Sequence, residues 1–306
     1  MMPACDAKVT ALFTYPVKSC AGISLQQARV TPRGLELDRD FMLVDDDDDF
    51  VSQRKVPELA LVVPTIAQRT ITLAAPGMEA ISVPLEDADE DRALVSATVH
   101  GKTVSGQLVG DDVNDWFTSF LPARKANKRY RLLRVRADRP RSIGERYRRS
   151  SASNLVGFAD ANSMLLATEP SLARLNNMLD HPVPMNRFRP NIVLDGARLE
   201  PYDEDFWRRI EVGAMSAFVV KGCDRCVIPD VDQATAITGK AVRRALLARK
   251  GANAYDRSNT GVFFAQNLNH VYREGLVLQV GDEVRVVERA QERNVVLRAE
   301  SVPAAA

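Results

Sequence analysis

The chain has 306 residues, of which 45% are hydrophobic and 26% are charged, a composition that allows one large globular domain or two moderate ones. The formal net charge of +1 gives no global sign of a nucleic-acid or anionic-membrane partner. No run of about 18 apolar residues could span a membrane, no signal-peptide pattern opens the chain, and four cysteines are too few for a disulfide scaffold. These features predict a cytoplasmic protein without stable nucleic-acid or membrane binding.

Antiparallel β-structure is predicted for the first half of the chain. Apolar and polar residues alternate at 8–15 and 22–30, and after a turn at 32–34 a further strand is predicted at 35–44. The aspartates at 45–49 lack the ligand spacing of an EF-hand and indicate a solvated hairpin tip. Shorter strands are predicted at 61–63, 70–73, 80–83 and 93–99, and a capped helix at 111–121.

The stretch 124–150 is rich in arginine and lysine and contains one predicted strand at 130–135. It suits either a surface for an anion or partner, or a solvated connection between domains. The second half mixes helices and strands. Helices are predicted at 168–176, capped near Thr168, and at 242–250, and strands at 191–194, 215–220 and 277–287.

Cys223 and Cys226 form a Cys-x-x-Cys pair, which is compatible with half a zinc site, a redox dithiol or one functional cysteine with a bystander. A structural zinc site needs four ligands, whereas Cys5 and Cys20 are isolated and the three histidines are scattered. A thioredoxin-like dithiol would open a helix, but residues 227–231 are predicted to be extended. The sequence therefore disfavours the first two kinds of site.

The remaining interpretation is a functional cysteine that follows a strand. Lys221 and Arg225 lie close in sequence and favour the thiolate, which is the form that binds a soft or borderline metal. A pair of buried structural cysteines, in a β-rich binding domain without catalysis, is the alternative that the motif leaves open.

Four motifs in order resemble one known family: Tyr15-Pro16-Val17-Lys18-Ser19, Gly34 with Asp38-Arg39-Asp40, Asn186 to Ile192, and Cys223 to Asp232. Together they resemble the MOSC proteins that carry an N-terminal β-barrel domain, the group that includes the amidoxime-reducing components and their bacterial relatives. The resemblance extends over about 9–287. It implies a predominantly β, α+β fold in which a β-barrel-like domain at 1–124 packs with a MOSC β-barrel at 125–306 that carries a few helices, joined at about 124–150.

The resemblance also implies a molybdenum cofactor, in which a pterin dithiolene and one protein cysteine hold the metal. Cys226 is the matching ligand and the predicted catalytic residue, and Cys223 is the bystander. Thiolate ligation suits such a soft, redox-active metal, and basic side chains suit the phosphate of the pterin. The resemblance assigns cofactor binding to Lys18, Ser19, Arg39, Arg54, Asp160, Arg187, Arg189 and Asn191.

The function implied is an oxidoreductase that removes oxygen from small N-hydroxylated compounds, a detoxification chemistry. The alternative within the family is a module that carries the molybdenum cofactor, or sulfur as a persulfide on Cys226, without reductase turnover. The chain ends at Ala306 without the cysteine set of an iron–sulfur cluster, so electrons are expected from a separate flavoprotein reductase, ferredoxin or cytochrome. No side chain stands out in the sequence as a general acid.

Overall fold

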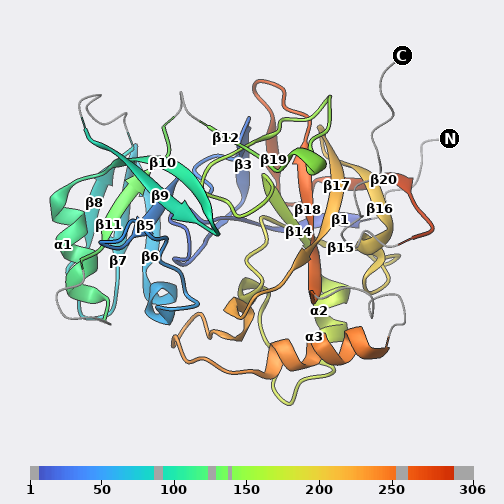
Figure 1. Ribbon diagram of the computed structural model, residues 1–306. Coiled ribbons are helices and arrows are strands. Elements are labelled where there is room, and N and C mark those ends of the chain that lie inside the picture. The colour runs from blue at the N-terminus through green and yellow to red at the C-terminus, as the bar shows by residue number, and fades with distance from the viewer. Residues whose placement is uncertain (1–6, 86–91, 123–128, 137–139, 253–260, 293–306) are drawn as a thin grey trace.

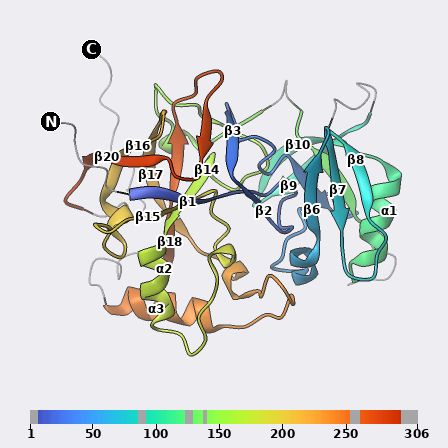
Figure 2. The same ribbon diagram turned by 180° about the vertical axis from the view of Figure 1, so that it is seen from behind.

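The computed structural model describes residues 7–85, 92–122, 129–136, 140–252 and 261–292. Two β-rich halves lie side by side, as opposite views show (Figures 1 and 2). The predicted α+β fold with mostly β-structure is confirmed. Among the described residues, no helix is both long enough and apolar enough to cross a membrane.

A closed barrel of seven strands forms one half of the molecule. Its strands in order are β15 (Ile192–Asp195), β14 (Met164–Thr168), β18 (Phe263–His270), β17 (Met215–Asp224), β16 (Trp207–Val212), β20 (Glu283–Arg289) and β1 (Ala7–Thr14). β1 pairs back with β15 and thereby closes the ring, which leaves no free edge among these seven strands. Only β14 and β15 run parallel, and β2 (Ile23–Leu25) continues the sheet beyond β1.

Both faces of β14 are buried, and this fixes where the helices pack. Met164 and Leu166 belong to the core inside the barrel, whereas Leu165 and Ala167 belong to a second apolar cluster outside it. The alternation follows the two-residue period of a strand. The second cluster includes apolar side chains of the helices α2 (Glu169–Asn176) and α3 (Ala241–Ala252), which lie below the barrel in Figure 1.

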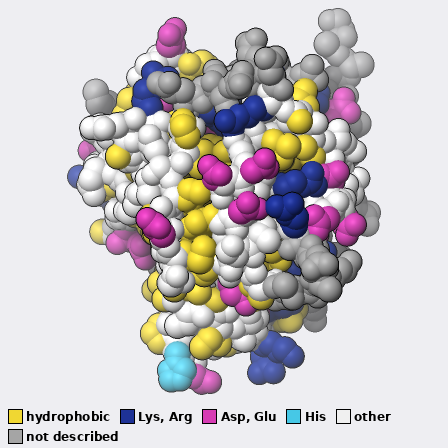
Figure 3. Space-filling view, turned by 90° about the vertical axis from the view of Figure 1, so that its left-hand side faces the viewer, with side chains coloured by type: hydrophobic (Ala, Val, Ile, Leu, Met, Phe, Trp, Pro, Cys, Tyr) yellow, Lys and Arg dark blue, Asp and Glu magenta, His cyan; other side chains and the backbone are white. Residues whose placement is uncertain are grey.

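The N-terminal half consists of two sheets with an apolar core between them. The four-stranded sheet is β5 (Phe41–Val44), β11 (Arg131–Arg134), β10 (Lys102–Leu108) and β9 (Leu94–Val99), and the three-stranded sheet is β6 (Val63–Ala67), β7 (Thr70–Ala74) and β8 (Ile81–Pro84). The helix α1 (Asp111–Phe120) contributes Phe117 to the same core. On the face toward this end of the molecule, acidic and basic side chains are interspersed with apolar atoms (Figure 3).

The two halves exchange strands. β1, from the start of the chain, belongs to the barrel, and β11, from beyond residue 124, belongs to the N-terminal sheet. A small sheet joins β3 (Gln27–Thr31) and β4 (Gly34–Leu35) to β19 (Val277–Gln279), and β12 (Arg141–Ser142) pairs with β13 (Leu155–Val156). The domain ranges 1–124 and 125–306 stay a prediction about folding units.

Several predicted elements have other boundaries in the structure. The strand predicted at 35–44 is interrupted, because residues 36–40 form a loop in which Leu37 and Arg39 adopt positive φ. Residues 277–287 form two strands separated by the turn at Gly281. The strand predicted at 61–63 is preceded by the 3₁₀ helix η1 (Pro57–Leu61) and begins only at Val63.

The predicted helices are present, and their caps differ. The Thr168 hydroxyl accepts a hydrogen bond from the backbone N–H of Ser171, so the predicted cap of α2 is confirmed. The helix predicted at 111–121 is α1, whose N-cap is Gly110 and which has no side-chain hydrogen bond at its cap. The remaining 3₁₀ helices are η2 (Glu145–Tyr147), η3 (Met185–Arg187), η4 (Asp203–Phe206) and η5 (Ile228–Asp230).

Candidate functional site

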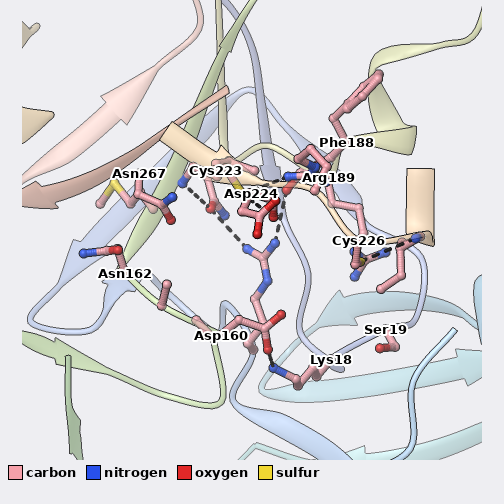
Figure 4. Close-up of a pocket in the computed structure, with 18 of the residues that line it drawn as sticks. Lys18, Ser19, Asp160, Asn162, Phe188, Arg189, Cys223, Asp224, Cys226 and Asn267 are labelled. Atoms are coloured by element: carbon pink, nitrogen blue, oxygen red, sulfur yellow. Dashed lines mark hydrogen bonds and ion pairs between the residues drawn. The ribbon is translucent and has the colours of Figure 1, made fainter. Parts of the chain in front are cut away.

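A cavity of about 430 Å³ lies where loops of the N-terminal half meet the barrel. Eight of the nine predicted site residues line it, and Arg187 does not. The N-terminal half contributes Lys18, Ser19, Arg39, Phe50, Arg54 and His100, and the barrel half contributes Asp160, Asn162, Arg189, Asn191, Lys221, Cys223, Arg225, Cys226 and Asn267 among others (Figure 4). Residues that are far apart in the sequence therefore share one concave site.

Cys226 lies between the end of β17 and the short helix η5. The expectation that residues 227–231 are extended is wrong, because Pro229 sits in the first turn of η5. The turn directs the backbone N–H of Ile228 toward the Cys226 sulfur, at 3.5 Å. Burial acts to lower the pKa of Arg54. The hydrogen bond and the charge attraction between Arg54 and Cys226 have the larger combined effect, so the pKa of Arg54 lies above its ordinary value. Cys226 thus lies beside a cationic side chain.

The other two described cysteines have different surroundings. Cys223 lines the same cavity, packs partly against the helices and accepts a hydrogen bond from Arg225 Nη1 at 3.0 Å. Cys20 is buried, and burial raises the pKa of its thiol to about 12. Within the described part of the chain, no three His, Cys, Asp or Glu side chains converge on a position for a metal ion. Cys5 lies outside the described residues.

An ion pair across the cavity joins the two halves of the molecule. Lys18 Nζ pairs with Asp160 and donates to the carbonyl of Phe158 at 2.6 Å. His100 Nε2 lies 3.2 Å from the same carboxylate, and His100 Nδ1 lies 3.4 Å from Arg54 Nη1. Burial alone would raise the pKa of Asp160, but the charge of Lys18 and the hydrogen bonds with His100 and Lys18 hold it well below its usual range. The network connects the Asp160 carboxylate to the arginine beside Cys226.

Asp160→Asn is expected to lower the free energy of unfolding by about 1 kcal/mol at neutral pH, because the buried Lys18 ammonium loses its carboxylate while Asp160 itself is half exposed. The folded-state pKa of Asp160 is depressed, so its contribution is present above the usual value of 3.8 and is lost as the pH falls through the folded pKa. Urea unfolding of both proteins along a pH series measures this.

The matched control for that change is Asp115→Asn, which removes an exposed carboxylate paired with the exposed Arg129. It is expected to leave stability unchanged within error. A stability difference between wild type and Asp160→Asn that persists undiminished at acid pH would show that the ion pair is not its source.

Two arginines of the cavity lining flank one buried tyrosine. The guanidinium carbon of Arg39 lies 4.4 Å from the centre of the Tyr15 ring, and that of Arg189 lies 4.3 Å from it. Arg39 donates to Asn191 Oδ1 and to the backbone carbonyl of Arg189, both at 3.1 Å. Burial raises the pKa of Tyr15 to about 12 although both arginines oppose it, so the neutral phenol donates to the Pro190 carbonyl at 3.1 Å.

The side chains of Arg189 and Asn191 differ in how many of their polar atoms form hydrogen bonds. The Asn191 amide accepts the backbone N–H of Leu165 at 3.0 Å and donates to the Phe13 carbonyl at 3.1 Å, so it ties barrel strands together. Arg189 Nη1 donates to the Cys20 carbonyl at 2.6 Å, whereas Nη2 is buried and has no partner among the described residues. Burial lowers the pKa of Arg189 to about 10, which leaves it charged at neutral pH.

Ser19 and Arg187 form hydrogen bonds that hold the segments around the cavity. Ser19 lines the cavity with a positive φ of 72°, and its carbonyl accepts a hydrogen bond from Gln53 at 2.6 Å. Arg187 lies outside the lining, where it donates to Asp232 at 2.6 Å and to the Pro229 carbonyl at 3.3 Å. Arg187 therefore braces the loop after Cys226, and its predicted contact with a cofactor stays a prediction.

Sequence reasoning did not assign Phe50, His100 or Lys221 to the cavity that they line. Phe50 lies under Lys18 Nζ, 4.6 Å from the ring centre, and its ring meets His100 edge-on. His100 occupies the tip of the β9–β10 hairpin with a φ of 50° beside Gly101, and this hairpin turn was the only available sequence signal.

Six basic side chains line the cavity against two carboxylates, those of Asp160 and Asp224. Because the charges share a partly enclosed space, the cavity attracts anions more strongly than the near-zero net charge of the chain suggests. The arrangement suits a ligand that carries phosphate and needs a thiolate at one end. In Figure 4, Ser19 and Cys226 lie at one end, and Asn162 and Asn267 lie at the other.

Comparison with known proteins gives two adjacent family matches. Residues 6–124 match the MOSC N-terminal beta barrel domain, and residues 154–285 match the MOSC domain. The mitochondrial amidoxime-reducing component 1 of Homo sapiens is 31% identical over 76% of this chain and 68% of that protein. The mitochondrial amidoxime reducing component 2 of Bos taurus is 29% identical over 90% and 82%, and that of Rattus norvegicus is 33% identical over 75% and 68%.

Proposed function

The chain belongs to the MOSC family that includes the amidoxime-reducing components, and from this premise we propose that it is a molybdenum-cofactor-dependent reductase of N-hydroxylated compounds. The observation that carries the proposal is the Cys226 thiol, which lies in a basic cavity beside Arg54. The overall reaction takes an N-hydroxyl group, two electrons and two protons to an N–H group and water.

The residues present fit such a cofactor in charge and in donor type. Cys226 supplies a thiolate for a soft metal, and Arg189 Nη2 is a buried donor without a partner among the described residues. Lys18, Arg39 and Arg189 line the cavity, and their positive charges favour a phosphate. When bound, the cofactor would supply two-electron redox chemistry at the metal.

The chain's own residues then have separable roles. Cys226 would hold the metal, and Arg54 places a positive charge and a hydrogen-bond donor beside its sulfur. Tyr15 sets the spacing of Arg39 and Arg189, and the pair of Lys18 with Asp160 fixes the distance between the two halves. Asn191 orients Arg39 through its amide oxygen. These contacts preorganise a site for an anionic ligand.

The relatives are named as components of a reducing system, which favours a separate electron donor. We include such a donor in the proposal, as a flavoprotein reductase, a ferredoxin or a cytochrome. Small N-hydroxylated molecules are the proposed substrates, detoxification is the proposed role, and a cytoplasmic location stays a prediction.

The test is reduction of benzamidoxime to benzamidine by the purified protein, loaded with cofactor in a competent host, with reduced methyl viologen as the artificial donor. Product formation that depends on protein and reductant is the expected result. Cofactor binding without product, together with a persulfide on Cys226 seen by mass spectrometry, would instead favour the sulfur-carrier alternative. Protein that takes up no molybdenum would contradict both.

A further inference from the structure

A second cavity, of about 710 Å³, shares no lining residue with the cavity that contains Cys226. Both cavities use the loop at 36–40, since Leu37 and Asp40 line the second cavity and Arg39 lines the first. The volume of the second cavity falls within the range of small-molecule sites. We call it the arginine cavity, because its lining includes Arg29, Arg33, Arg69 and Arg134.

The four arginines come from three separate sheets. Arg29 lies on β3, Arg33 lies in the turn between β3 and β4, and Arg134 lies on β11. Arg69 is the second residue of the two-residue turn between β6 and β7. Segments that are distant in the sequence thus place like charges around one space, which is unfavourable unless anions balance them.

The turn between β6 and β7 holds Arg69 in a strained backbone conformation. Gln68 and Arg69 have φ values of 45° and 64°, and a two-residue hairpin turn with positive φ at both positions usually carries asparagine or glycine there. The Arg69 carbonyl accepts the backbone N–H of Leu85, another lining residue, at 2.7 Å, which fixes the turn in place. Strained residues cluster at ligand-binding positions, so Arg69 is a candidate ligand.

Arg33 and Asp40 form the floor of the arginine cavity. Asp40 is buried and Arg33 is half-buried, whereas Arg69 is exposed at the rim. Arg33 Nη2 donates to both carboxylate oxygens of Asp40, at 2.8 and 3.0 Å. Arg33 Nε is buried and has no partner among the described residues. Buried donors are normally satisfied, so this N–H requires an acceptor that the described part of the chain does not supply.

The charge of the lining suits a dianion. The lining contains four arginines but two carboxylates, those of Glu36 and Asp40, so two positive charges remain. A phosphate monoester carries about 1.5 to 2 negative charges at neutral pH, more than a simple carboxylate, and the guanidinium fork matches phosphate oxygens. The lining also has apolar side chains that suit an organic group, namely Pro32, Ile66, Leu85, Pro140 and Leu155.

We propose that the arginine cavity binds a small organic phosphate, whose phosphate group contacts Arg33 and Arg69 and whose apolar part packs against Ile66 and Leu155. This ligand is separate from the cofactor and the substrate of the proposed function, because it occupies a different cavity.

The test is calorimetric titration of the purified protein with phenyl phosphate and with inorganic phosphate. The wild-type protein is expected to bind one phenyl phosphate per chain, about tenfold more tightly than inorganic phosphate, because only the ester buries a ring against the apolar walls. Arg69→Met should weaken this binding by about tenfold, the effect of one charged hydrogen bond. Arg33→Lys keeps a charge for Asp40 but lacks Nε and the planar fork, so it should weaken binding by a similar factor.

Two control variants should bind phenyl phosphate as the wild type does. Arg174→Met removes an exposed arginine of α2 outside both cavities, and Lys221→Met removes a basic residue of the cavity that contains Cys226. Arg69 is exposed, and its substitution leaves the pair of Arg33 with Asp40 intact, so Arg69→Met is expected to fold.

Three results would overturn the inference. The first is the absence of saturable phenyl phosphate binding by the wild-type protein. The second is binding that persists in Arg69→Met and Arg33→Lys but weakens in Lys221→Met, which would place the anion in the cavity that contains Cys226. The third is equal affinity for the two phosphates, which would reject an organic ligand. Binding is measured without turnover, so failure of this proposal and failure of the reductase function are separate outcomes.

Discussion

Cys226→Ser is expected to reduce bound molybdenum from near one per chain to background and to lower reductase activity by at least about 100-fold, since even the outer partners of metal ligands contribute 10- to 100-fold. The substitution replaces the sulfur that would bind the metal with an oxygen. A hydroxyl oxygen is a harder ligand atom than a thiol sulfur, so it does not match a soft metal. Metal content by mass spectrometry and turnover with benzamidoxime are the two measurements.

Cys223→Ser is the matched control, because Cys223 lines the same cavity three positions earlier in the chain. Its sulfur accepts from Arg225 and packs partly against the helices, an environment that a serine hydroxyl can share. This variant should keep its molybdenum and most of its activity. Full metal in Cys226→Ser, or metal loss only in Cys223→Ser, would show that the ligand has been assigned to the wrong cysteine.

The site was easier to predict from the sequence than the path of the backbone through it. The motif Asp38-Arg39-Asp40 pointed to the cavity, yet local alternation predicted a strand there. The strand is interrupted because Asp38 accepts the backbone N–H of Tyr15 at 2.9 Å and Arg39 takes a positive φ to reach Asn191. Long-range hydrogen bonds override the local strand preference at this point.

His100 and Lys221 were hidden for a related reason. His100 meets Asp160 across 60 residues of sequence, and only the register of the β9–β10 hairpin places it there. The place of Lys221 in the cavity, with its Nζ 4.4 Å from the centre of the Tyr147 ring, depends on how distant segments fold together, so no spacing in the sequence could indicate it. The exchange of β1 and β11 between the halves is likewise a property of pairing, not of composition.

Tyr15→Ala is expected to lower the free energy of unfolding by about 3–5 kcal/mol, the usual cost of deleting a buried aromatic side chain. It also removes the ring that Arg39 and Arg189 share, so the buried Arg189 and the partly buried Arg39 lose their common neighbour. We expect cofactor retention to fall with stability, measured as molybdenum per folded chain together with urea unfolding.

Tyr15→Phe separates the ring from the hydroxyl. It keeps the contact with both arginines and loses only the bond to the Pro190 carbonyl, which should cost about 1 kcal/mol and leave cofactor content near wild type. If the phenylalanine variant loses as much molybdenum as the alanine variant, the hydroxyl and the position of Pro190 hold the site in place. If only the alanine variant loses it, the spacing of the two arginines is what the cofactor requires.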